Sequence, residues 1–162
     1  MNQLVEDLQT DTTTVRAMLE SDLDAVVRID AEASGRRRPR YFQLMTQRAL
    51  QFAGLQISLV AIVDGAVAGY LIASLYYGEY GIAEPSASID AIGVAAHLRR
   101  HRVGHELLQQ FRSNQCAIGV TTIRTEVDWD NFDLLPFFRS EGFAPSKRIC
   151  LELACREGGT IR

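Results

Sequence analysis

Residues 87–111 contain a change of hydrophobic period that constrains the fold more than any other feature of the chain. Before Ala95 the run is short, apolar and partly β-branched, which is typical of a strand. After Arg102 the apolar residues recur at helical spacing, at Val103, Leu107, Leu108 and Phe111. The Arg-rich turn between them places the unpaired N–H groups of a helix start beside several guanidinium groups. This arrangement predicts a site for a polyanionic, phosphate-bearing ligand.

The spacing inside this segment resembles a known signature. From Val94 the chain reads VAAHLRRHRVGHELL, similar to the V-x-P-x-x-[RQ]-x-x-G-x-[GA]-x-x-L-L pattern with which GNAT N-acetyltransferases wrap the pyrophosphate of acetyl-CoA. Ala96 replaces the usual Pro, and Arg102 replaces the first Gly. Because glycine permits positive φ and close approach to phosphate, Arg102 is expected either to keep helical geometry or to turn its guanidinium toward the ligand. The matching positions are Val94, Arg99, Gly104, Leu107 and Leu108.

A second segment, residues 123–143, resembles the strand, Asn, helix and Gly-Phe pair that follow in the same family. The matches are Asn131, Phe137, Gly142 and Phe143. Gly142 is expected to end the helix in the left-handed region, and Phe143 to begin the next strand. Pro136 fits if Asn131 or Asp133 is the N-cap, because a proline in the first turn sacrifices no helical hydrogen bond.

The remaining periodicity gives the order β-α-α-β-β-β-α-β-α-β, which is the GNAT order. The resemblance therefore implies an α/β fold with a central mixed, mostly antiparallel sheet and helices on both faces. We expect a flexible extension over 1–12, one acetyltransferase domain over 13–154 and a tail over 155–162. The further predicted elements are strands at 14–18, 57–63, 66–77, 121–127 and 148–153, a hairpin turn at Asp64-Gly65, and helices at 22–32, at 41–52 closed by Gly54, and at 132–141.

Composition narrows the class of protein. The net charge of −3 argues against a dedicated nucleic-acid binder. No apolar run approaches the roughly 20 residues that span a bilayer, and the N-terminus does not resemble a signal peptide, so we expect a cytoplasmic protein without membrane contact. Cys116, Cys150 and Cys155 lack metal-ligand spacing, so we expect buried free thiols, no disulfide and no metal site. The apolar terminal strand favours a homodimer.

Acetyl transfer to an amine needs a base, and Asp90 is the best candidate because it lies on the strand that leads to Val94. Strand alternation would place Asp90 on the same side as Ile92 and Val94, where burial would raise its pKa. The alternative is an aspartate that merely pairs with an arginine, and Glu126 and Asp128 are weaker candidates for the base. In the family a backbone N–H, at the position that corresponds to Val94, stabilises the oxyanion of the tetrahedral intermediate.

The leaving thiolate is often protonated in this family by a Tyr four residues before the helix-ending Gly, and that position is Phe138. Three readings stay open: water assists the thiolate, another group substitutes, or the chain no longer catalyses transfer. The candidate substitutes are Tyr70, Tyr76, Tyr77 and Cys150. The aromatic residues Trp129, Phe132, Phe137 and Phe143 are expected in the core.

The favoured function is an N-acetyltransferase that uses acetyl-CoA as cosubstrate on a primary amine of a small molecule or peptide. The alternatives are a catalytically impaired acyl-CoA-binding module with a sensing or regulatory role, and an unrelated nucleotide-phosphate binder. The loop at 35–40, GRRRPR, either meets an acidic acceptor or, as we favour, is a solvated charge run. His101 and His105 are expected at the surface. The predicted acetyl-CoA contacts are Ile92, Val94, Arg99, Arg100, His101, Arg102, Val103, Gly104 and Asn131.

Overall fold

The structure is a computed structural model that describes residues 13–51, 57–153 and 155. The chain forms two compact units, Met1–Glu126 and Val127–Arg162. The predicted N-terminal extension, the ends of the second helix at Phe52 and Gly54, and all but Cys155 of the predicted tail lie outside the described residues.

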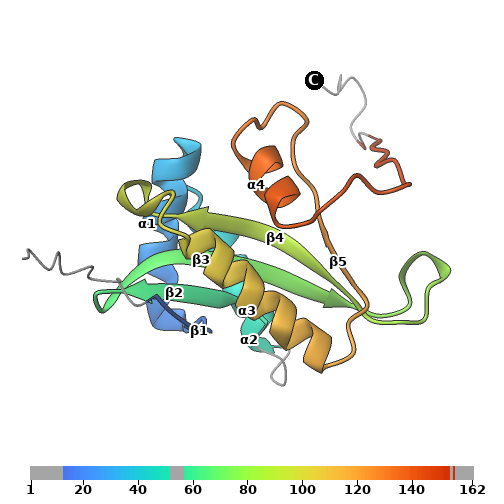
Figure 1. Cartoon of the computed structure of the whole chain (residues 1–162), viewed down its shortest axis with the longest axis horizontal. Coiled ribbons are helices and arrows are strands. Elements are labelled where there is room, and N and C mark those ends of the chain that lie inside the picture. The colour runs from blue at the N-terminus through green and yellow to red at the C-terminus, as the bar shows by residue number, and fades with distance from the viewer. Residues whose placement is uncertain (1–12, 52–56, 154, 156–162) are drawn as a thin grey trace, which may run out of the picture. The chain divides into compact units, whose positions relative to one another are not determined.

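The first unit is built on a five-stranded sheet in the order β1-β2-β3-β4-β5 (Figure 1). Neighbouring strands are antiparallel except β4 and β5, which are parallel, so the sheet is mixed and mostly antiparallel as predicted. The strands are β1 (Thr14–Ala17), β2 (Leu59–Val63), β3 (Ala66–Tyr76), β4 (Ser86–Val94) and β5 (Thr122–Thr125).

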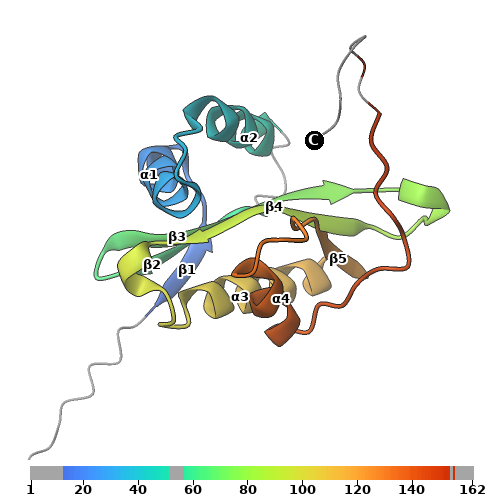
Figure 2. The ribbon, with the colours of Figure 1, turned by 90° about the horizontal axis from the view of Figure 1, so that it is seen from above.

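Helices cover both faces of this sheet, which also confirms the prediction. Figure 2 shows α1 (Leu23–Ser34) and α2 (Pro39–Gln51) on one face and α3 (Val103–Ala117) on the other. No helix in the described part of the chain combines the length and apolarity that crossing a membrane would require. Short 3₁₀ turns at Glu20–Asp22, Glu79–Gly81 and Ala96–Leu98 complete the unit.

Local sequence explains where these elements begin and end. Gly35 ends α1 in the left-handed region with φ 68°, and its N–H donates to the Ala31 carbonyl. Pro39 opens α2, where its fixed φ suits the first helical position. Asp64 and Gly65 join β2 to β3 with φ values of 50° and 76°, as a hairpin turn with two positive φ angles requires.

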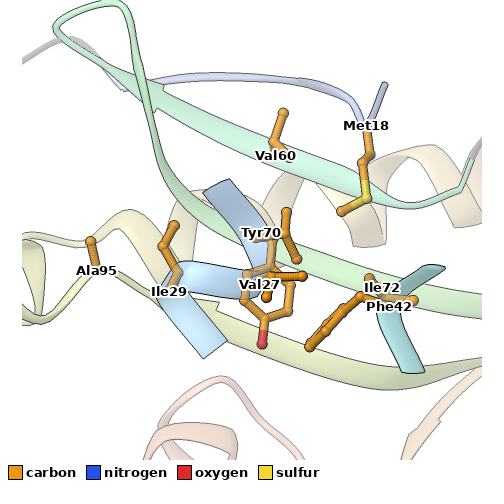
Figure 3. Close-up of a cluster of buried hydrophobic side chains, with 9 residues drawn as sticks. Met18, Val27, Ile29, Phe42, Val60, Tyr70, Ile72 and Ala95 are labelled. Carbon is orange, nitrogen blue, oxygen red and sulfur yellow. The ribbon is translucent and has the colours of Figure 1, made fainter. Parts of the chain in front are cut away.

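The core between the sheet and the α1–α2 pair contains a cluster around Tyr70, which is 1% exposed (Figure 3). From Gly69 onward, the even-numbered residues of β3, such as Tyr70 and Ile72, face this cluster. Gly69 and the odd-numbered residues after it face α3, since a Cβ on Gly69 would lie 3.1 Å from side-chain atoms of Leu107 and Val103. The labelled members of the cluster are Met18, Val27, Ile29, Phe42, Val60, Tyr70, Ile72 and Ala95.

The second unit contains α4 (Leu134–Ser140), in agreement with the predicted helix. Pro136 is its third residue and therefore lies in the first turn, as expected. Gly142 ends the helix with φ 92°, and the Phe143 N–H donates to the Phe138 carbonyl at 2.9 Å. The rings of Phe138 and Phe143 lie 5.0 Å apart, which completes a Schellman motif with its hydrophobic contact.

Several predictions for the C-terminal part of the chain are wrong. Phe143 does not begin a strand, and residues 148–153 form none, because the segment joins no ladder within the described chain and an isolated strand is not stable. The aromatic residues Trp129 and Phe132 are 85% and 77% exposed rather than in the core, since both precede α4 in irregular chain. Ile149, Leu151 and Leu153 are 86–90% exposed, and Cys116, Cys150 and Cys155 are free but exposed.

Candidate functional site

Strands β4 and β5 are the last two strands of the sheet, and they separate partway along β4. Their pairing ends at Ile89 and Thr125, where the Thr125 hydroxyl donates to the Ile89 carbonyl at 3.1 Å. Beyond this point β4 pairs only with β3 among the described residues. The Ala95 N–H donates to the Ala68 carbonyl, so alternation turns the main-chain groups of Ile92 and Val94 away from β3, toward the open edge. This edge can donate N–H groups to an extended ligand.

A β-bulge lies at the point of separation. Ile72 pairs with Ala91 and Ala73 with Ile89, so Asp90 is the extra residue on β4. The bulge corrects the predicted orientation of Asp90: it points to the α1–α2 face with Ala91, whereas Ile92 and Val94 face α3. The pairing of Val94 with Gly69, whose Cβ position meets α3, supports this assignment. Simple alternation fails because one inserted residue reverses the side-chain parity.

Asp90 is half-buried and is held by a neutral partner. The Ser74 hydroxyl donates to Asp90 Oδ2 through a short hydrogen bond, and Oδ1 has no partner among the described residues. The expected alternative, a pairing of Asp90 with an arginine, is therefore not what the structure contains. Burial raises the pKa of the Tyr41 phenol on α2, and the negative charge of Asp90 raises it further. Ser74 and Tyr41 were not predicted, because only the bulge and the packing of α2 bring them to Asp90.

The Arg-rich turn after β4 has an unusual backbone. Arg100 and Arg102 adopt left-handed conformations with φ of 67° and 63°. Arg102 therefore does not keep helical geometry, but takes the conformation that the family signature usually gives to glycine. A left-handed residue other than glycine costs about 1–2 kcal/mol, and such strain persists only where the surrounding structure fixes it.

This turn leads directly into the N-terminus of α3. Arg102 is the N-cap but supplies no side-chain cap, and the first intrahelical bond runs from the Glu106 N–H to the Arg102 carbonyl at 2.9 Å. The N–H groups of Val103 and Gly104 thus have no acceptor inside the helix. Val103 is buried, while Arg99, Arg100 and Arg102 are exposed. Eight of the nine predicted contacts lie along one stretch, from the open edge of β4 to the start of α3.

His101 lies in the same turn and is exposed, as predicted, with Nδ1 3.0 Å from the Arg99 carbonyl oxygen. Asn131 belongs to the second unit. Its side-chain oxygen accepts the Leu134 N–H at 3.0 Å and so caps α4.

The position expected to carry a general acid holds a buried Phe138, 4% exposed. Tyr70, one predicted substitute, donates its hydroxyl proton to Asp30 Oδ1 at 3.1 Å, and burial raises its pKa far above the usual value. Tyr76, Tyr77 and Cys150 are exposed.

An ion pair with a buried carboxylate lies on the α1–α2 face and was not predicted from the sequence. Arg38 donates from Nε and Nη2 to the two carboxylate oxygens of Asp30, at 3.0 and 2.6 Å. The Asp30 side chain is 4% exposed, and the hydrogen bonds to it raise the pKa of Arg38. The charge run at 35–40 is therefore only in part the solvated loop that we favoured. A signal was present, since Asp30 occupies an apolar face of its helix eight residues before Arg38.

Comparison with solved structures agrees with this fold. A transcriptional regulator from Bacillus halodurans superposes with a TM-score of 0.70 at 19% identity, covering 88% of this chain and 99% of that one. Aminoglycoside N-acetyltransferase AAC(6′)-Iy, in complex with CoA, gives 0.74 at 17% identity, with coverages of 90% and 96%. Ard1 from Thermoplasma volcanium gives 0.69 at 25% identity, with coverages of 83% and 84%.

No curated protein sequence matches the chain. The profile of the acetyltransferase (GNAT) family matches residues 23–143, a span that includes the separated strands, the Arg-rich turn and the start of α3. This protein therefore belongs to the acetyltransferase (GNAT) family.

Proposed function

We propose that this protein is an N-acetyltransferase that binds acetyl-CoA along β4 and the Arg-rich turn and transfers the acetyl group directly to a primary amine. The observation that carries the proposal is the separation of β4 from β5 at the Asp90 bulge. It leaves the N–H groups of Ile92 and Val94 free to pair with the amide-bearing arm of CoA. The CoA held by the similar aminoglycoside N-acetyltransferase supports this ligand.

The turn supplies complementary charge for the pyrophosphate. The N–H groups of Val103 and Gly104 at the start of α3 and the guanidinium groups of Arg99, Arg100 and Arg102 would bind it. Asn131 is proposed as a contact of the pantetheine arm that also caps α4. A basic cluster otherwise opposes the positive end of a helix dipole, so a bound anion gives these arginines a physical role.

In the proposed reaction Asp90 takes a proton from the ammonium group through Oδ1, directly or through water, while Ser74 holds Oδ2. The neutral amine attacks the thioester carbonyl, and the Val94 N–H stabilises the resulting oxyanion. The C–S bond then breaks while the new C–N bond is kept, and the attacking nitrogen releases its second proton. Water carries this proton to the leaving thiolate of CoA, because Phe138 has none to donate.

Phe138 also favours the second candidate function, an acyl-CoA-binding module without transferase activity. Calorimetry with acetyl-CoA, ATP and NAD tests the ligand, since binding of another nucleotide but not CoA would refute both candidates. Product detection by mass spectrometry with a panel of amines separates them. A thiol reagent that detects released CoA is unsuitable unless the signal of the protein itself is subtracted, because Cys116, Cys150 and Cys155 are exposed and would react.

The base is tested by Asp90→Asn, for which we expect kcat to fall about 10²–10⁴-fold, the usual contribution of a general base. Glu126→Gln is the matched control, because Glu126 is exposed and was a rival candidate. An unchanged rate and pH profile in Asp90→Asn, or an equal loss in both variants, would contradict the assignment.

A further inference from the structure

Arg38 lies at the connection between α1 and α2. One edge of its guanidinium group binds a carboxylate, and the group also packs against two aromatic rings. Its Nε and Nη2 bind both oxygens of the buried Asp30, which also accepts the Tyr70 hydroxyl. Its guanidinium carbon lies 5.2 Å from the ring centre of Tyr41 and 5.7 Å from that of Phe42. These contacts fix the orientation of the guanidinium before any ligand arrives.

The opposite edge of the same guanidinium is open. Nη1 has no hydrogen-bond partner in the described part of the chain, and the side chain is 45% exposed. A guanidinium with one edge bound presents its other edge as a planar fork that matches a carboxylate. Asp30 offsets one positive charge, but Arg36, Arg37 and Arg40 flank the connection, are exposed, and form no ion pair among the described residues.

The open edge of Arg38 and the carboxylate of Asp90 belong to the same face of the sheet. Ser74, which binds Asp90, and Tyr70, which binds Asp30, are both even-numbered residues of β3 and face the α1–α2 pair. Tyr41 packs against Arg38, and the charge of Asp90 acts on its phenol. One face therefore offers an anion suited to an ammonium group and a preorganised cation suited to a carboxylate.

We propose that the acceptor is an aminocarboxylate, a molecule that carries both a primary amine and a carboxylate, whose amine faces Asp90 and whose carboxylate binds the open edge of Arg38. This inference rests on the proposed function and adds the acceptor class to it. An acceptor that carries only positive charges, such as an aminoglycoside, would be repelled by the arginines of the connection.

Acceptor pairs that differ only in the carboxylate test the proposal directly. Lysine and cadaverine, tyrosine and tyramine, and 6-aminohexanoate and pentylamine are compared as acceptors with the full chain and acetyl-CoA. We expect kcat/KM to be at least about tenfold higher for the carboxylated member of at least one pair, as a charge-assisted bidentate contact provides. Equal or better use of every decarboxylated member would refute the proposal.

Binding measured by calorimetry in the presence of CoA separates this inference from the proposed function. Binding of a carboxylated acceptor but not its decarboxylated partner, without transfer, would support the recognition by Arg38 and refute catalysis. Transfer to amines without any preference for the carboxylate would support the proposed function and refute the inference. Absence of binding by all three carboxylated acceptors would also refute it.

Arg38→Lys keeps the charge beside Asp30 but removes the planar fork. We expect KM for the carboxylated acceptor to rise about tenfold. The value of kcat, and KM for the decarboxylated partner, should stay within about twofold of the parent values. The double variant Arg38→Gln/Asp30→Asn removes both charges, avoids an unpaired buried carboxylate and should give the same pattern. Arg112→Lys, at an exposed position on α3, is the control and should change neither KM. An equal loss for both members of a pair would show that Arg38 only supports the fold.

Discussion

Gly93 lies on β4 between the proposed oxyanion contact at Val94 and the edge residue Ile92, and the structure leaves no room there for a methyl group. A Cβ at Gly93 would lie 2.6 Å from Cε1, 2.9 Å from Cζ and 3.0 Å from the hydroxyl oxygen of Tyr70. Ordinary carbon contacts are about 3.5–4.0 Å, so Gly93→Ala requires the ring to move by roughly 1 Å. The ring cannot move freely, because it is buried, packs 5.6 Å from the Phe42 ring and donates to Asp30.

The cost of Gly93→Ala can be worked from these contacts. Overpacking costs about 1–3 kcal/mol, and weakening the hydrogen bond to the Asp30 carboxylate adds up to about 1.5–3 kcal/mol. Replacing glycine in a strand returns about 0.5–1 kcal/mol. We therefore expect the free energy of unfolding to fall by about 2 kcal/mol, which for a chain of this size lowers Tm by roughly 4–8 °C.

Urea unfolding followed by circular dichroism measures this change. The control is Tyr70→Leu, alone and combined with Gly93→Ala, because removing the ring should abolish most of the clash. The double variant should then be more stable than the sum of the single changes predicts, by more than about 0.5 kcal/mol. A Gly93→Ala protein within about 0.5 kcal/mol of the parent, or strictly additive effects, would refute the reasoning.

Three further predictions concern the ends of helices. The pKa of Asp22 is lowered, first by its hydrogen bond from Arg16, so its stabilisation is present above the ordinary carboxyl pKa of 3.8 and is lost as pH falls through the lower folded value. Below about pH 4, the urea concentration at the unfolding midpoint should fall more steeply with decreasing pH in the parent than in Asp22→Asn. Equal slopes in the two proteins would contradict this. Asn131→Ala removes the cap of α4 and should lower the free energy of unfolding of its unit by about 1 kcal/mol, whereas Asn131→Asp should retain the cap and most of the stability. Arg102→Gly should raise the free energy of unfolding by up to about 1 kcal/mol, because glycine adopts positive φ without strain. Arg102→Val should lower it by more than that, since a β-branched residue tolerates positive φ poorly. Indistinguishable melting curves for the two variants would argue against a left-handed Arg102.

The sequence predicted the elements of the first unit well because their signals are local. The Asp64-Gly65 turn, Gly35 after α1 and the helical spacing after Arg102 each act within a few residues. The same applies to Gly142 after α4. Residues 148–153 have the composition of a strand, but a strand depends on a partner, and periodicity says nothing about whether one exists.

The position of Asp90 shows the limit of the same reasoning. Its residue type and its place on β4 were sufficient to select it as the candidate base. Its direction was predicted wrongly, because the bulge depends on the register between β3 and β4, which no local pattern encodes. Ser74 lies 16 residues before Asp90 and meets it only through that register.

The sequence by itself determined the family, the cosubstrate expected at the Arg-rich turn and the candidate base, because these depend on residue types at short, fixed spacings. Only the tertiary structure decided that Arg102 occupies a left-handed conformation, that Asp90 turns to the α1–α2 face, and that Asp30 fixes Arg38 against Tyr41. The direction of Asp90 depends on the register between β3 and β4, and the contacts of Arg38 depend on how α1 packs against α2. In both cases packing and buried charge, rather than local propensity, select the arrangement.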